Sequence, residues 1–191
     1  MKRSIIIIGS MLPFVFLLGQ EAQPEAVKPW KTGGNTGFTI TQTSLTNWAA
    51  GGDNSLATNA YFSIFANHKQ GKGAWDNTLD LAYGLLKQGE EAVRKSDDKI
   101  DFASKYGYEA SKKWYYTALL NFKTQFTDGF KYPNDSVAIS RFMAPAYLVG
   151  SLGMDYKPND FFTMFLSPLT AKFTIVNDET LSNSGAYGVE A

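Results

Sequence analysis

The stretch WYYTALLNFKTQF, residues 114–126, alternates between apolar and polar side chains with a period of two. Its even positions are Trp114, Tyr116, Ala118, Leu120, Phe122, Thr124 and Phe126, whereas its odd positions are mostly polar. Successive side chains of a β-strand point to opposite faces of a sheet, so the pattern predicts a strand with one apolar and one polar face. A helical stripe with a spacing of four would leave Tyr116 and Leu120 outside it, and the aromatic content favours a strand.

The same alternation recurs along the chain, and we find no helical run of useful length. The alternating segments are 35–45, 55–67, 75–86, 99–110, 114–126, 144–156 and 161–176, with an eighth beginning near Ser184. These runs hold 11 to 16 residues, whereas strands of globular proteins have about 5–6 and a tilted transmembrane strand needs about 9–11. The sequence therefore predicts an all-β, antiparallel up-and-down meander of about eight long strands.

Short and long links alternate between these segments. The short links are 68–73, 110–112 and 157–160, and the long ones are 46–54, 87–98, 128–143 and 177–183. Outer-membrane barrels join their strands by short periplasmic turns at one rim and by longer extracellular loops at the other. The link lengths therefore favour a transmembrane β-barrel, incomplete if strands are missing after Ala191.

The distribution of charge agrees with a barrel. Lys105, Lys123 and Lys172 all fall on the polar parity, and a lysine facing lipid at the midplane would cost about 2–4 kcal/mol. We expect the apolar parity to face lipid and the polar parity, with Asn121, Lys123, Gln125 and Thr170, to face the interior. A soluble periplasmic β-sandwich stays open as an alternative, because its inner face would be equally apolar.

The N-terminus has the pattern of an export signal. Lys2 and Arg3 precede an apolar run, Ser4–Leu18, of 15 residues that Pro13 interrupts, whereas a spanning helix needs about 20 residues. We assign residues 1–20 to a signal peptide, 21–34 to a linker and 35–191 to the β-barrel domain. An uncleaved N-terminal anchor is the other interpretation, and either one sends the rest of the chain out of the cytoplasm.

Composition excludes several classes of function. Lys and Arg number 18, as do Asp and Glu, and no basic run with interleaved aromatics occurs, which argues against nucleic-acid binding. The chain has no cysteine, so it holds neither a disulfide nor a thiolate zinc site. Aromatic residues make up 15% of the chain, which suits a large β-surface with aromatic girdles.

A set of motifs resembles one known family. The motifs are Trp30-x-x-Gly33-Gly34, Gln42 to Ser55 with Trp48-Ala49-Ala50-Gly51-Gly52, Trp75 to Gly84, Lys95 to Ile100, Lys123 to Phe126, Ala144 to Tyr147 and Ser167 to Thr170. Together they resemble domain of unknown function family 3078 (DUF3078), a group of exported, uncharacterised, β-barrel-like outer-membrane proteins of Gram-negative bacteria. The resemblance covers essentially the whole chain after the signal peptide.

The resemblance implies a location and partners but no reaction. The implied partners are outer-membrane lipid and the barrel assembly machinery. Members usually extend past the point that matches Ala191, so the resemblance implies a chain without the last third and without the terminal aromatic residue that many barrels use for assembly. Closure would then need further strands or another chain. Because the family has no established reaction, no catalytic residue is transferred.

Few residues suggest chemistry. His68 is the only histidine, and its Lys/Gly surroundings favour a solvated turn residue over a catalytic base. Asp97, Asp98 and Asp101, with Glu90 and Glu91 nearby, could bind Ca²⁺ through oxygen ligands, but the spacing is not that of an EF-hand and lysines compensate the charge. We therefore assign no catalytic, cofactor or metal residues, and a membrane-embedded hydrolase is the least favoured class.

Glycines and prolines are better explained by structure than by chemistry. Gly33-Gly34 and Gly51-Gly52 lack the sequence context of a phosphate loop, and Trp48 suits an interfacial aromatic before a turn. Pro145 and Pro168 lie within strand-like runs, where each predicts a bulge, a rim or a sheet edge. The expected protein is a non-enzymatic outer-membrane barrel with a structural role or a role in passage or binding of small solutes.

Overall fold

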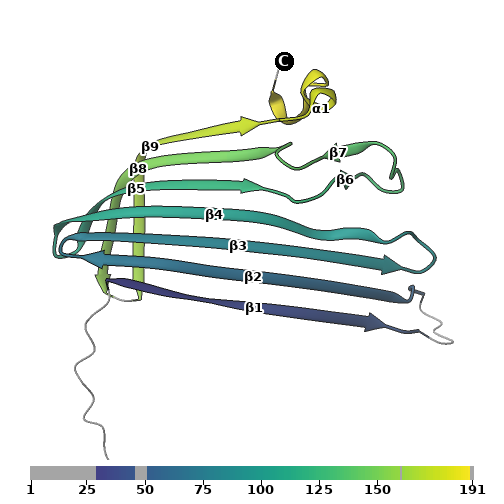
Figure 1. Ribbon diagram of the computed structural model, residues 1–191, viewed down its shortest axis with the longest axis horizontal. Helices are drawn as coiled ribbons and strands as arrows, with labels where there is room; N and C mark the ends of the chain where they lie inside the picture. The colour runs from purple at the N-terminus through teal and green to yellow at the C-terminus, as the bar shows by residue number, and fades with distance from the viewer. Residues whose placement is uncertain (1–28, 46–50, 160, 190–191) are drawn as a thin grey trace, which may run out of the picture.

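The computed structural model describes residues 29–45, 51–159 and 161–189, and it is dominated by one large sheet (Figure 1). Seven strands are hydrogen-bonded in the order β1 (Trp30–Thr43), β2 (Ser55–Gln70), β3 (Gly73–Gln88), β4 (Arg94–Ser111), β5 (Trp114–Thr124), β8 (Ala146–Asn159) and β9 (Phe162–Ile175). Two short strands, β6 (Gly129–Phe130) and β7 (Ala138–Ser140), pair with each other. A short helix, α1 (Glu179–Asn183), and a 3₁₀ turn, η1 (Ala186–Gly188), follow the last strand.

The predicted all-β antiparallel meander is confirmed, with differences at its ends. Every neighbouring pair in the large sheet is antiparallel. The prediction of a strand beginning near Ser184 is wrong, because α1 and η1 occupy this stretch. Asp178 caps α1 by accepting a hydrogen bond from the backbone N–H of Leu181. Burial raises the pKa of the Tyr187 hydroxyl, which donates to the carbonyl oxygen of Ile139.

Several expectations fall at or before the start of the sheet. The signal peptide at 1–20, most of the linker and Trp48 lie outside the described residues. The linker was expected to end at residue 34, but β1 already begins at Trp30 and pairs with His68 of β2. Among the described residues, no helix has both the length and the apolar character needed to span a membrane.

The predicted alternation of short and long links is confirmed. Links 71–72, 112–113 and 160–161 lie at one end of the strands, and links 44–54, 89–93 and 125–145 lie at the other. The link expected at 87–98 is shorter, because β3 extends to Gln88 and β4 begins at Arg94. We call the two ends the short-turn rim and the loop rim.

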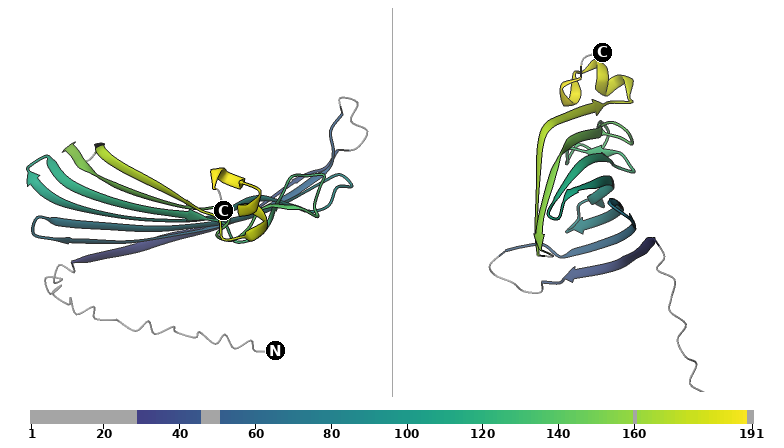
Figure 2. Two further views of the ribbon diagram at one scale, coloured as in Figure 1. Left: turned by 90° about the horizontal axis from the view of Figure 1, so that it is seen from above. Right: turned by 90° about the vertical axis from the view of Figure 1, so that its left-hand side faces the viewer.

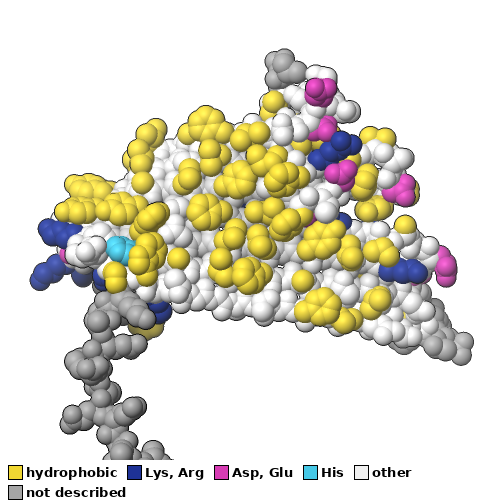
Figure 3. Space-filling view, in the orientation of Figure 1, with side chains coloured by type: hydrophobic (Ala, Val, Ile, Leu, Met, Phe, Trp, Pro, Cys, Tyr) yellow, Lys and Arg dark blue, Asp and Glu magenta, His cyan; other side chains and the backbone are white. Residues whose placement is uncertain are grey.

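One face of the sheet is apolar and uncovered. The cross-strand register places side chains of the apolar parity on one side, and many of them are exposed: Phe38 (67%), Leu120 (44%), Leu152 (54%) and Phe173 (60%). Figure 3 shows hydrophobic side chains spread across this face. The only buried hydrophobic residues among those described are Ala82, Ala144, Ala146 and Leu181, so the described part of the chain has no hydrophobic core between layers.

The sheet is strongly curved, and β8 and β9 bend away from their neighbours near the short-turn rim (Figures 1 and 2). The register between them shifts at Leu152 and Met154, where Ser167 and Pro168 lie opposite the single residue Gly153. Of the bulge, rim or sheet edge expected at Pro168, the structure has a bulge, and it lies in the edge strand β9, where a residue without an N–H is tolerated. Pro145, also as expected, lies at the loop rim just before β8.

The sheet has two edge strands. β1 and β9 each pair with one neighbour only among the described residues, and they do not pair with each other. The described strands therefore form an open, curved sheet rather than a closed barrel.

Gly153 is required where the sheet bends. A Cβ atom at this position would overlap the carbonyl oxygen of Leu166, whereas a Cβ at Gly150, on the same strand, would meet no atom within 4 Å. We expect Gly153→Ala to lower the free energy of unfolding by about 1–3 kcal/mol, as overpacking does. Urea titration in detergent micelles measures this loss. Gly150→Ala is the matched control, and an equal loss in both variants would contradict a close approach at Gly153.

Candidate functional site on the concave face

The second face of the sheet is polar and concave. It carries Asn59, Ser63, Asp76, Asp80, Asp101, Lys105, Asn121, Lys123, Ser151, Asp155, Lys157, Thr170 and Lys172. Lys105 of β4 lies 5.0 Å from the ring centroid of Phe165 in β9. Two strands, β5 and β8, lie between β4 and β9, and neighbouring strands are about 4.8 Å apart. A contact over that span is favoured when the sheet curves toward its polar side.

Asp155 is the centre of this face. Its side chain is 1% exposed, and its Oδ2 lies 2.6 Å from Lys105 Nζ and 3.8 Å from Lys157 Nζ. The Lys157 ammonium lies 5.2 Å from the ring centroid of Tyr115. Two cations, each beside an aromatic ring, thus enclose one carboxylate.

The ion pair between Asp155 and Lys105 connects the bent strand β8 to β4 at the centre of the sheet. Asp155 lies two residues after Gly153, the residue of β8 opposite the bulge in β9, and the bend carries it over β5 toward Lys105 on β4. The buried Oδ1 atom has no hydrogen-bond partner among the described residues. Buried carboxylates are costly unless they are paired, so the two lysines are needed to hold Asp155 in this place.

Further polar contacts extend across the concave face. Asp101 accepts a hydrogen bond from Asn121 Nδ2 at 2.7 Å and lies 3.1 Å from Lys123 Nζ. The Ser63 hydroxyl donates to Asp80 at 2.6 Å. Lys172 lies over the ring of Tyr147. The face thus presents paired charges, amides and hydroxyls, which can bind polar solutes without a strong preference for either sign of charge.

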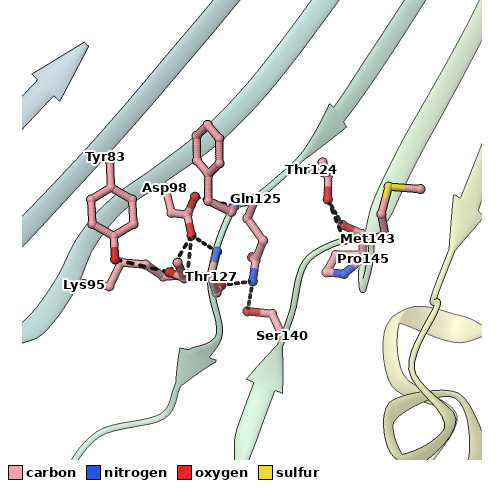
Figure 4. Close-up of polar contacts among 10 residues, drawn as sticks. Tyr83, Lys95, Asp98, Thr124, Gln125, Thr127, Ser140, Met143 and Pro145 are labelled. Atoms are coloured by element: carbon pink, nitrogen blue, oxygen red, sulfur yellow. Dashed lines mark hydrogen bonds and ion pairs between the residues drawn. The ribbon is translucent and has the colours of Figure 1, made fainter.

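Most residues expected on the polar face lie there, and one does not. Lys105, Asn121, Lys123, Thr170 and Lys172 all fall on the concave side. The expectation for Gln125 is wrong, because it lies beyond the end of β5. Its amide donates to Ser140 Oγ and to the carbonyl oxygen of Thr127 (Figure 4), so it holds the link between β5 and β8.

The expectation that His68 is a solvated turn residue is wrong. His68 lies within β2 and pairs with Trp30 across the sheet. Its ring centroid is 4.7 Å from that of Trp30, on the apolar face. The spacing of two between His68 and the apolar residues Ile64 and Ala66 could have placed it there.

The three aspartates considered for Ca²⁺ have separate partners. Asp97 accepts a hydrogen bond from Asn59, Asp101 contacts Lys123, and Asp98 contacts Lys95 at 2.7 Å. Within the described ranges, no group of three or more His, Asp or Glu side chains has an arrangement that could hold a metal ion.

Asp98 instead anchors the long link of the loop rim (Figure 4). Its carboxylate accepts hydrogen bonds from the backbone N–H groups of Phe126 and Thr127. Lys95 also donates to the carbonyl oxygen of Thr127. At the far end of the link, Thr124 accepts from the N–H of Met143 and donates to the carbonyl oxygen of Pro145. The link is thus fixed at both ends to β4 and β5.

Sequence reasoning did not single out Asp155. The residue stands at an odd position in 144–156, where even positions carry the apolar side chains. It is the only charged residue in that stretch. An isolated carboxylate on the polar parity of a strand is a signal for an interior ion pair, but its lysine partner two strands away could not be read from the sequence.

Comparison with known proteins supports the family resemblance. Residues 40–130 match the model of a family described as protein of unknown function (DUF3078). Neither a curated protein nor a solved structure gives a significant match. The match over residues 40–130, which contain β2, β3, β4 and β5 in full, thus supports the resemblance to the DUF3078 family of proteins of unknown function.

Proposed function

We propose that this protein is a non-catalytic outer-membrane β-barrel protein whose concave face binds or passes small polar solutes. One observation carries the proposal: the apolar face of the sheet is exposed, while charged groups gather on the concave face. A soluble β-protein buries its apolar face against a second layer. A transmembrane barrel has the opposite arrangement, with apolar residues outside and polar residues inside.

Strand length supports the same proposal. The seven strands of the large sheet run from 11 residues in β5 to 18 in β4. A tilted strand that crosses a bilayer needs about 9–11 residues. Each of the seven is long enough to cross, and the longer ones would extend beyond the lipid at the loop rim.

Aromatic side chains gather at the short-turn rim. The rings of Trp30 and Trp75 lie 5.8 Å apart on the apolar face, and those of Trp114 and Tyr156 lie 4.6 Å apart. Tyr108 lies on the same face, 48% exposed. Such a band suits the level of lipid headgroups, where amphipathic rings are enriched in transmembrane barrels. With this band at the inner leaflet, the short turns face the periplasm.

The alternative of a soluble periplasmic β-sandwich binding module is less well supported. It would require a second sheet over Leu120 and its apolar neighbours. The described residues hold one seven-stranded sheet and the small β6–β7 pair at the loop rim, and Leu120 is 44% exposed.

Cell fractionation tests the proposal. In a Gram-negative host that expresses the full chain, we expect the protein in the outer-membrane pellet and expect it to resist extraction with alkaline carbonate. The reason is that the apolar face is stable only against hydrocarbon. A peripheral periplasmic protein of similar size is the control for extraction. Recovery of the folded protein in the soluble periplasm without detergent would overturn the proposal and favour the sandwich.

A further inference from the structure

We infer that the short-turn rim binds the headgroups of anionic phospholipids, an inference that rests on the proposed function because it names the lipid class that contacts the barrel. The binding groups are four lysines, Lys69, Lys72, Lys112 and Lys113, which we call the rim lysines. Lys72, Lys112 and Lys113 lie in the two turns that join β2 to β3 and β4 to β5, and Lys69 lies near the end of β2, just before the first of these turns.

The rim lysines are exposed, and no described acidic residue pairs with them. All four are solvent-exposed, and none forms an ion pair within the described part of the chain. Figure 3 shows Lys and Arg side chains gathered at the short-turn end of the sheet. The interior lysines differ, because Lys105, Lys123 and Lys157 each face an aspartate.

The opposite end of the molecule has the reverse charge. The described links of the loop rim and the segment after β9 hold seven acidic residues, Asp53, Glu90, Glu91, Asp128, Asp135, Asp178 and Glu179, against two basic ones, Lys131 and Arg141. Acidic residues thus exceed basic ones at that end, although the whole chain has a formal net charge of zero. The positive charge at the short-turn rim is therefore a local property and does not reflect a basic chain.

The aromatic band fixes where the rim lysines would lie relative to lipid. Trp114 directly follows Lys113, and Trp75 lies three residues after Lys72, which is about 10 Å along an extended strand. Rings at the membrane interface would hold the lysines at or just beyond the phosphate groups, within reach of a flexible ammonium. A lysine close to an anionic membrane surface strengthens lipid binding by electrostatic attraction.

Quenching of tryptophan by brominated lipid measures the local lipid composition. The full chain, with Trp48→Phe so that fluorescence comes from Trp30, Trp75 and Trp114 at the short-turn rim, is refolded into phosphatidylcholine vesicles with a minor share of phosphatidylglycerol. Bromine is placed on one lipid class at a time. We expect phosphatidylglycerol to be about fivefold preferred at the rim, the equivalent of about 1 kcal/mol, and expect the preference to fall at high salt.

Two double variants of equal charge change decide the assignment. Lys72→Gln with Lys112→Gln should reduce the preference below about twofold. Lys87→Gln with Lys131→Gln removes two exposed lysines at the loop rim and should leave the preference unchanged. A wild-type protein without preference, or equal preference in both double variants, would overturn the inference.

Failure of the proposed function would give a different result. If the protein does not enter the bilayer, neither brominated phosphatidylcholine nor brominated phosphatidylglycerol quenches its tryptophans, and the barrel proposal fails with the inference. If both lipids quench in proportion to their bulk shares, the protein is inserted and only the headgroup inference is lost.

Discussion

Replacement of Asp155 by Ala is expected to lower the free energy of unfolding by about 3 kcal/mol, the lower end of the range for breaking a buried ion pair. The side chain of Asp155 is 1% exposed, and its loss leaves Lys105 and Lys157 facing each other without a counter-charge. The loss lies at the lower end because the side chains of Lys105 and Lys157 are 25% and 34% exposed. Urea titration of the refolded protein, followed by tryptophan fluorescence, measures it.

Asp101 offers a matched control for Asp155. Its partner Lys123 is 53% exposed, so Asp101→Ala should cost no more than about 1 kcal/mol, as for an exposed ion pair. Replacing both Asp155 and Lys105 by Leu and Met should recover part of the Asp155→Ala loss, because only the more exposed Lys157 then lacks a counter-charge. Equal losses at Asp155 and Asp101 would show that Asp155 does not tie β8 to β4.

Leu120→Arg is expected to block insertion into phospholipid vesicles. Leu120 lies on the apolar face in the middle of β5 and is 44% exposed. An arginine facing lipid at the midplane costs about 2–4 kcal/mol. The folded fraction in vesicles, read from the shift in gel mobility of unboiled samples, should fall well below that of the wild-type protein.

The control for Leu120 must place the same charge on the concave face. Gln125→Arg is unsuitable, because the Gln125 amide holds Ser140 and Thr127. Thr39 and Ile40 of β1 offer a better pair, since both are exposed and they point to opposite faces. Ile40→Arg should impair insertion as Leu120→Arg does, whereas Thr39→Arg should be tolerated. Equal insertion of Thr39→Arg and Ile40→Arg would contradict the assignment of the faces.

Much of the fold could be predicted because the sheet has one apolar and one polar face. In β5 the period of two runs without interruption from Trp114 to Phe122, and the structure has the strand there. The absence of charged residues from the apolar positions also correctly predicted that Lys105 and Lys123 lie on the polar face. Each of these features is local in sequence, so side-chain alternation alone is enough to determine it.

The bend of β8 and β9 could not be predicted from side-chain alternation alone. In β9 the apolar face takes the even positions Phe162 to Leu166 and then the odd positions Leu169 to Ile175, because the bulge at Ser167 and Pro168 inserts one residue. A single parity for 161–176 could not describe both halves. Pro168 did indicate a bulge, but the direction of the bend depends on packing between strands.

The candidate site depends on that bend, which explains why it was missed. Asp155 meets Lys105 only when β8 curves over β5, and the two residues are far apart in sequence. His68 was misplaced for the opposite reason: its turn-like neighbours Lys69 and Gly71 concealed a strand that continues to Gln70. For His68, the alternation of side chains thus indicated the position better than the residue types of its neighbours in sequence.

The outer edges of strands β1 and β9, unpaired within the described part of the chain, have a consequence for biogenesis. Each leaves a row of backbone N–H and C=O groups without a partner among the described residues, and every such group would cost several kcal/mol in hydrocarbon. In water the same rows would template aggregation. If the protein enters a bilayer as proposed, both edges would have to pair with complementary strands during insertion, so that folding and insertion would be one concerted event.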